Sequence, residues 1–173
     1  MKKIVIILMV FTIYGCGSET NKNNRSSVTS TYTKVGEILK TDLFEITVNS
    51  VEIKPKIKTG NQYLDPKSDP SSSFLIFNVK FKNIDTESRM PFEGIVKVNY
   101  NGKDYEFDSP EPIMADGYGL FFDQINPLTS TTTNIVFKIP NELRGKMYWQ
   151  PGRTNELIYL GEIEAKETPV NGK

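Results

Sequence analysis

Apolar and polar side chains alternate at every second position along much of this chain, and this period constrains its fold most strongly. The alternation is clearest in two segments, 74–83 and 133–139. Their apolar faces consist of Leu75, Phe77, Val79 and Phe81 in the first segment and of Thr133, Ile135, Phe137 and Ile139 in the second. Residues two apart lie on the same side of an extended strand, so we predict half-buried strands with one face on a core.

A tight hairpin is predicted at 100–103, where the sequence is Tyr-Asn-Gly-Lys. Both central residues of a type I′ turn need a positive φ, which Asn and Gly tolerate best. The turn fixes the register of the two flanking strands. The cross-strand pairs that it predicts are Val98 with Tyr105 and Val96 with Phe107.

The segment 44–53 carries an irregularity. Its apolar positions change parity between Val48 and Val51. A β-bulge near Asn49 and Ser50 would explain the change, and so would a strand that passes from one sheet to another. The sequence is compatible with both.

About seven strands follow from these patterns. We expect them near 34–40, 43–54, 73–83, 92–100, 103–107, 130–139 and 156–163, with one short helical turn at 141–145 after Pro140. Short strands without a long helix predict an all-β fold, a two-sheet antiparallel β-sandwich.

The N-terminus predicts export and lipidation. Lys2 and Lys3 precede an apolar run, 4–14, which is too short to cross a membrane as a helix but suits a secretory signal peptide. The next residues, Gly15 and Cys16, complete a sequence that resembles the lipobox of bacterial lipoproteins. In that family the signal is removed before the cysteine, whose thiol carries diacylglycerol. Cys16 is also the only cysteine of the chain.

Three regions are therefore expected. Residues 1–15 form a lipoprotein signal peptide. Residues 16–33 form a lipidated cysteine and a flexible tether, because this stretch is rich in Ser, Thr and Asn and holds too few large apolar residues to order itself. Residues 34–173 form the β-sandwich domain. We expect the membrane to be a partner through the lipid on Cys16.

Four segments resemble a known group of domains. They are VGEILKTDLFEITVNSVEI (35–53), FLIFNVKFKN (74–83), VKVNYNGKDYEFD (96–108) and INPLTSTTTNIVFKIP (125–140). With the lipobox and tether, they resemble the immunoglobulin-like domain of unknown function that is common in secreted lipoproteins of Gram-positive bacteria. That group is similar in fold to a secreted mycobacterial immunoprotective antigen. The resemblance implies an immunoglobulin-like β-sandwich and assigns no catalytic residue.

Composition excludes several kinds of activity. The chain has no histidine, so it can build neither Ser-His-Asp nor Cys-His catalysis nor an imidazole-ligated metal site. Its 21 basic and 21 acidic residues balance, which argues against a nucleic-acid binder that works through its overall field. We expect no enzyme activity and no cofactor.

The long polar connection 54–73 has two interpretations. Its Asp65 and Asp69 could bind calcium together with carboxylates of a second loop, Asp108, Glu111, Asp116 and Asp123, or all of them are simply solvated. Lysines at 54, 56 and 58 share one face of an extended chain. They either hold an anionic polymer or lipid headgroups, or protect an edge strand, together with Pro55, from pairing with other chains.

A second loop, 109–127, is unusually apolar. Tyr118, Phe121 and Phe122 lie there among Gly and Pro residues. They either fold over one end of the core or form an exposed patch for a protein partner, since aromatic residues and Met are enriched in interface cores. We expect Trp149 to lie in or over the core.

These observations favour a membrane-anchored extracytoplasmic lipoprotein that acts as a non-catalytic protein-binding or accessory module, for which an envelope protein is a candidate partner. The alternative is a lipoprotein that binds a small molecule, a metal ion or an anionic wall polymer through loops 54–73 and 109–127.

Lipidation gives the first testable prediction. Cells that express the full-length chain should incorporate radioactive palmitate into it, because Cys16 supplies the thiol. A Cys16→Ala variant should carry no label on gel autoradiography. Label that persists in this variant would refute the assignment.

Overall fold

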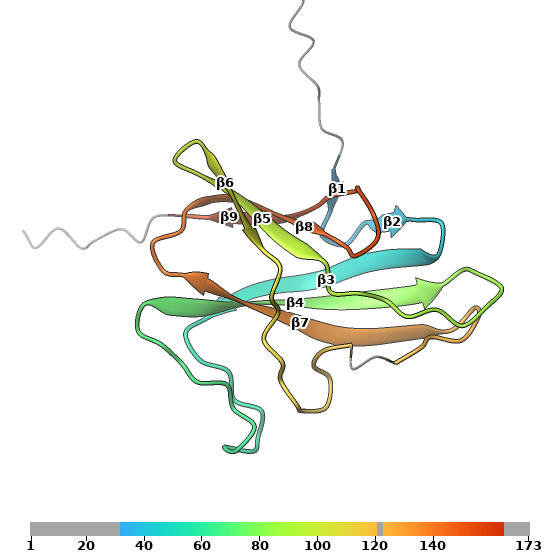
Figure 1. Cartoon of the computed structure of the whole chain (residues 1–173), viewed down its shortest axis with the longest axis horizontal. Helices are drawn as coiled ribbons and strands as arrows, with labels where there is room; N and C mark the ends of the chain where they lie inside the picture. The colour runs from blue at the N-terminus through green and yellow to red at the C-terminus, as the bar shows by residue number, and fades with distance from the viewer. Residues whose placement is uncertain (1–31, 121–122, 165–173) are drawn as a thin grey trace, which may run out of the picture. The chain divides into compact units, whose positions relative to one another are not determined.

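A computed structural model describes residues 32–120 and 123–164. These residues form nine β-strands in two sheets (Figure 1). They contain no helix, and therefore none that is long and apolar enough to cross a membrane.

The five-stranded sheet has the order β1–β9–β8–β5–β6. Its strands are β1 (Thr33–Lys34), β5 (Ile95–Tyr100), β6 (Lys103–Phe107), β8 (Gly145–Gln150) and β9 (Ile158–Ile163). The four-stranded sheet has the order β2–β3–β4–β7. Its strands are β2 (Ile38–Lys40), β3 (Phe44–Lys54), β4 (Ser72–Asn83) and β7 (Ser130–Pro140). All pairs of neighbouring strands are antiparallel except β1 with β9. The predicted β-sandwich is thus confirmed.

The core lies between the sheets, and β4 and β7 line it as their alternation predicts. Every residue of the two predicted apolar faces is buried. Across the paired strands, the rings of Phe77 and Phe137 stack with centroids 6.0 Å apart and planes 4° apart. The polar residues Asn78 and Lys80 alternate with these positions and are not buried.

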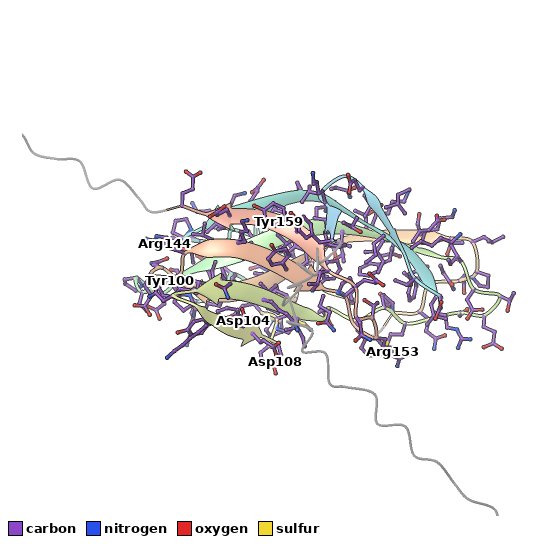
Figure 2. All side chains as sticks on the ribbon, turned by 90° about the horizontal axis from the view of Figure 1, so that it is seen from above. Tyr100, Asp104, Asp108, Arg144, Arg153 and Tyr159 are labelled. Atoms are coloured by element: carbon purple, nitrogen blue, oxygen red, sulfur yellow. The ribbon has the colours of Figure 1, made fainter. Side chains whose placement is uncertain are left out.

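The predicted hairpin is confirmed in turn and register. Asn101 and Gly102 have φ angles of 52° and 72°, as a type I′ turn requires. Tyr100 pairs with Lys103, and the further pairs are Val98 with Tyr105 and Val96 with Phe107. The turn lies at one end of the sandwich, near Tyr100 in Figure 2.

The irregularity in β3 is a bulge. The register with β4 shifts between Val48 and Ser50, and the strand continues in the same sheet. Val51 then lies opposite Phe77, whose side chain is in the core. The extra residue therefore returns the apolar positions to the inner face.

One central strand, β8, was missing from the expected set, and the predicted helical turn at 141–145 is absent. Residues 141–142 form a turn, and β8 begins at Gly145. Only Met147 and Trp149 of this short strand are buried, so its own pattern is weak. Its position is determined by hydrogen bonding to β5 and β9 on its two sides.

The predicted strand 34–40 is two strands in different sheets. The chain turns at Gly36, whose φ is 88°, and its backbone amide donates to the carbonyl oxygen of Val48 at 2.8 Å. Before the turn, β1 pairs with β9, and after it, β2 pairs with β3. A positive φ is easily accessible only to glycine, so the strand breaks there.

Trp149 is fully buried between the sheets, as expected. Its ring lies 5.0 Å from that of Phe77 and 6.2 Å from that of Phe81, measured between centroids. Its indole N–H donates to the backbone carbonyl of Glu93. One side chain thus joins both sheets and the segment that enters β5.

Truncating this side chain should be costly. We expect Trp149→Ala to lower the free energy of unfolding by about 3–5 kcal/mol, through lost burial and the cavity left behind. Tyr63→Ala is the matched control, because Tyr63 is 86% exposed, and it should change stability by less than about 0.5 kcal/mol. Urea unfolding followed by circular dichroism measures both. Similar losses in the two variants would contradict the assignment.

Candidate functional site

The connection between β6 and β7 leaves the five-stranded sheet and passes to the outer side of the four-stranded sheet (Figure 1). This outer face is apolar near one end. A second buried cluster forms there from Ile57, Phe74, Ile76, Ile113 and Val136. Phe74, Ile76 and Val136 come from the sheet, whereas Ile57 and Ile113 come from the two long loops. Both loops therefore serve as a cover for the sheet.

Backbone hydrogen bonds fasten the loop to the edge of β7. The amide of Glu111 donates to the carbonyl of Val136 at 2.8 Å, and that of Gly119 donates to the carbonyl of Asn134 at 2.9 Å. In return, the amide of Asn134 donates to the carbonyl of Gly117 at 2.8 Å. These bonds satisfy edge groups of β7 that would otherwise be open to another chain.

A row of asparagine side chains adds to this attachment. The amide of Asn49 donates to Asn78 at 2.7 Å, and that of Asn78 donates to Asn134 at 3.0 Å. The amide of Asn134 donates in turn to the carbonyl of Gly117 at 3.0 Å. The row crosses three strands and ends on the loop, so it holds Gly117 against the sheet.

A second segment, 84–94, faces this loop. It is anchored at Asn83, which is fully buried and whose side-chain amide donates to the carbonyls of Glu87 and Ile125, each at 2.7 Å. Arg89 exchanges two backbone hydrogen bonds with Ile125, at 3.1 and 2.8 Å. Near the end of the segment, the carbonyl of Glu93 accepts a hydrogen bond from the indole N–H of Trp149.

Together the two segments enclose a cavity of about 400 Å³, which we name the loop groove. Its walls are Met90–Glu93 and Pro110–Met114, and Leu120, Ile135 and Val136 also line it. Most of these side chains are apolar. Met114 stands at the groove with 65% of its surface exposed. A concave, largely apolar hollow of this size is typical of a binding site.

Only two ionisable side chains line the loop groove, Glu93 and Glu111. Among the described residues neither forms an ion pair. Their charge is available to a bound partner, and it favours a positive one.

The predicted partner-binding residues are only partly described. Tyr118 is half-buried and packs against the second cluster, on the outer face of the sheet rather than at an end of the core. Leu120 and Ile125 of the same loop reach the main core. Phe121, Phe122 and Cys16 lie outside the described residues, as do the predicted signal peptide and residues 16–31 of the predicted tether.

Two of the carboxylates considered for calcium, Asp65 and Asp69, organise the loop 54–73. Asp65 accepts hydrogen bonds from the amide and hydroxyl of Thr59, at 2.7 and 2.9 Å, and these bonds lower the pKa of its carboxyl. Asp69 accepts from the amide and hydroxyl of Ser71, which lowers its pKa in the same way. Within residues 32–120 and 123–164, no three acidic or Cys side chains lie close enough together to hold a metal ion.

Lys54, Lys56 and Lys58 are all exposed. Lys54 ends β3, and β2 pairs only with residues 45–47 of that strand. The rest of β3 therefore has an edge among the described residues. This arrangement favours the edge-protecting interpretation of these lysines.

Met90, Pro91 and Phe92, which wall the loop groove, were not singled out from the sequence. Three consecutive apolar residues between a polar loop and a strand were the available signal. The opposite wall of the groove, Pro110–Met114, belongs to loop 109–127, and the only signal for it in the sequence was the unusual apolar composition of that loop.

Truncating two neighbouring residues of the loop should change the stability of the protein to very different extents. Ile113→Ala should lower the free energy of unfolding by about 2–5 kcal/mol, because Ile113 is buried in the second cluster. Met114→Ala should change it by less than about 0.5 kcal/mol, because Met114 is exposed. Thermal and urea unfolding measure both. Equal effects would show that the loop does not pack as described.

Solved structures of other proteins share this fold. No curated protein matches the chain. A β-sandwich protein from Clostridium difficile 630, itself uncharacterised, is 14% identical, with a TM-score of 0.55 over 76% of this chain and 96% of that chain. The yjhA protein from Bacillus subtilis is 19% identical, with a TM-score of 0.50 over 75% of this chain and 99% of that chain.

A third structure, a candidate lipoprotein (ycdA) from Bacillus subtilis subsp. subtilis str. 168, is 14% identical and covers 66% of this chain and 33% of that chain. Its TM-score is 0.45. The first two likenesses support the β-sandwich. The family model for a domain of unknown function, DUF4352, matches residues 33–150. This chain therefore belongs to the DUF4352 family, which agrees with the β-sandwich domain of unknown function expected from its sequence.

Proposed function

We propose that this protein is a lipid-anchored, extracytoplasmic accessory module that binds an envelope protein without catalysing a reaction. One observation carries the proposal, the loop groove. It is a largely apolar hollow on the surface, about 400 Å³ in volume, that the chain builds from two separately anchored segments.

Exposed apolar surface supports binding to a protein. Met114 exposes 65% of its surface beside the groove, and Phe92 and Met90 line the opposite wall. Contiguous apolar surface of this kind marks interaction sites, and Met and Phe are enriched at the centres of interfaces. Both walls are tied down by hydrogen bonds, so little order has to be gained on binding.

The negative charges beside the loop groove indicate which kind of protein segment it can bind. Glu93 and Glu111 place two carboxylates around an otherwise apolar hollow. An apolar side chain flanked by Lys or Arg matches this arrangement, because the cation meets a carboxylate while the apolar group fills the groove. We therefore expect the partner to present such a segment.

The non-catalytic part of the proposal rests on the available chemistry. The chain has no histidine, and the groove offers only two carboxylates among apolar residues. The anchoring part rests on Lys2, Lys3 and the apolar run before Cys16. Diacylglycerol supplies two acyl chains, which hold a protein firmly at a membrane where one chain binds only marginally.

Photo-crosslinking in living cells tests the proposal. A photoreactive amino acid at Met114 of the full-length chain should give one recurrent adduct with an envelope protein, identified by mass spectrometry. The same amino acid at Leu128 is the control, since Leu128 is 77% exposed and does not line the groove. It should not give that adduct.

Two variants make the test specific. Glu111→Lys should lower the yield of the Met114 adduct severalfold by reversing a charge beside the groove. Cys16→Ala should abolish the adduct by releasing the protein from the membrane. An adduct of equal yield at Leu128, or one indifferent to Glu111→Lys, would contradict binding through the loop groove.

A further inference from the structure

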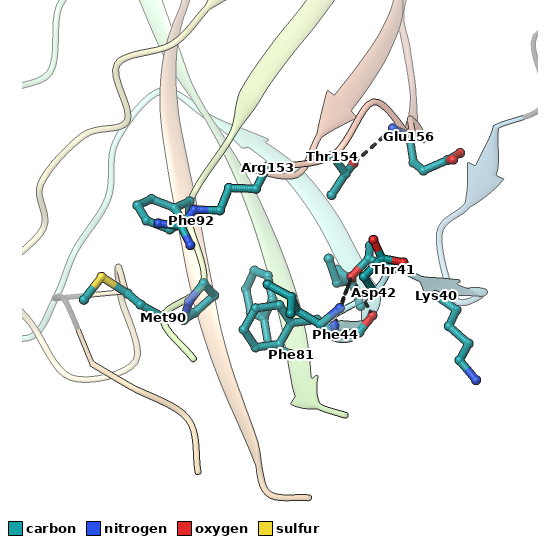
Figure 3. Close-up of a pocket in the computed structure, with 14 residues that line it drawn as sticks. Lys40, Thr41, Asp42, Phe44, Phe81, Met90, Phe92, Arg153, Thr154 and Glu156 are labelled. Atoms are coloured by element: carbon teal, nitrogen blue, oxygen red, sulfur yellow. Dashed lines mark hydrogen bonds between the residues drawn. The ribbon is translucent and has the colours of Figure 1, made fainter. Parts of the chain in front are cut away.

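A second cavity, which we name the end cavity, opens at the end of the sandwich opposite the β5–β6 turn. Its volume is about 270 Å³. Three segments surround it, namely the turn Thr41–Leu43, the connection Met90–Phe92 and the loop from Gly152 to Glu156 (Figure 3). In Figure 2, Tyr100 of the hairpin lies near the left end of the molecule and Arg153 of this last loop lies in the right half.

Aromatic rings form the inner part of the end cavity. Phe44 and Phe81 meet edge to face, with centroids 6.0 Å apart, and both are buried in the core. The turn that precedes Phe44 is closed by Thr41, whose hydroxyl accepts a hydrogen bond from the Phe44 amide at 2.9 Å. Because these rings are only 7% and 1% exposed, the accessible apolar lining of the cavity is Leu43, Met90 and Phe92, which are half-buried.

Arg153 is held over this cavity in an unfavourable backbone conformation. Its φ is 64°, which a residue with a Cβ rarely adopts. Its guanidinium carbon lies 4.1 Å from the ring centroid of Phe92, so the ring covers one flat side (Figure 3). Gly152 permits this approach, because a Cβ there would overlap the Cβ of Phe92.

Stacking occupies a flat side of the guanidinium and not its edge, where the N–H groups lie, and Arg153 is exposed. Among the described residues Arg153 forms no ion pair. A guanidinium in this state is a fork of donors suited to a carboxylate. The strained backbone therefore presents an anion-binding group at the mouth of the end cavity.

The rim also carries negative charge. Asp42 and Glu156 line the cavity from the two sheets, and neither forms an ion pair among the residues that the structure describes. Lys40 also lines the cavity, so a simple anion would be attracted by Arg153 and Lys40 but repelled by the two carboxylates. A molecule with both charges satisfies both signs at once.

We infer that the end cavity binds a small zwitterion with an apolar body, the chemistry of a free apolar amino acid or a short apolar peptide. Its carboxylate lies on Arg153, its ammonium group faces Asp42, and its apolar part lies against Leu43, Met90 and Phe92. This cavity shares the residues Met90–Phe92 with the loop groove, but the inference does not depend on the proposed protein partner.

Binding of blocked and unblocked ligands to the full-length chain in detergent tests the inference. The probes are L-leucine and L-leucyl-L-leucine, with N-acetyl-L-leucine and L-leucinamide, which each lack one charge. Calorimetry should show at least one zwitterion binding about tenfold or more tightly than both blocked compounds. The tighter of the two zwitterions distinguishes an amino-acid site from a peptide site. Equal binding of blocked and unblocked compounds, or no binding of either zwitterion at about 10 mM, would overturn the inference.

Arg153→Gly separates binding from folding. Glycine suits a positive φ, so this variant should melt at or above the wild-type temperature while losing about tenfold or more in affinity. Leu128→Gly is the matched control, because Leu128 has a φ of 62° and lies outside the end cavity. It should keep wild-type affinity.

Two further variants complete the test. Arg153→Lys keeps the charge without the planar fork and should bind with intermediate affinity. Asp42→Asn should weaken the zwitterions and leave N-acetyl-L-leucine unaffected. Wild-type affinity in Arg153→Gly would refute the assignment.

Discussion

The rest of the candidate site depends on one constraint: β7 is the last strand of its sheet, so its edge and its apolar outer face need a cover. Edge groups left open would pair with other chains, and Val136 would lie in water beside Phe74 and Ile76. The loop after β6 meets both needs, since its backbone bonds to β7 and its Ile113 covers the apolar face. The loop groove is the space left between this fixed loop and Met90–Phe92.

Strands were predicted best where they are long enough to contain several core-facing residues at every second position. β4 and β7 are long, and their inner faces were predicted residue by residue. The hairpin was predicted because Asn101 and Gly102 meet a local requirement of the turn. β8 has only two buried residues, and it is a strand because β5 and β9 flank it. That cause lies far away in the chain, beyond the reach of a local pattern.

The loop groove was within partial reach of the sequence. Phe74 and Ile76 alternate with Leu75 and Phe77, so they had to lie on the face opposite the core. Two large apolar residues on an outer face require a cover, but the predictions made from the sequence did not use this signal. Which loop supplies the cover, and through which residue, depends on the path from β6 to β7. No sequence pattern predicts the end cavity, because it forms between three short segments that are distant in sequence.

The two sites share one wall, and its rigidity bears on both. Met90, Pro91 and Phe92 line the loop groove on one side and the end cavity on the other. Gly94 approaches the backbone of residues 150–152 so closely that a Cβ would overlap it, and Gly152 meets Phe92 in the same way. Glycine at both positions lets the wall lie directly against the β8–β9 loop. The indole N–H of Trp149 also donates a hydrogen bond to the carbonyl of Glu93, the residue that follows the wall. A wall fixed at three points keeps both hollows open before anything binds. Affinity can then be used for recognition instead of for ordering the site.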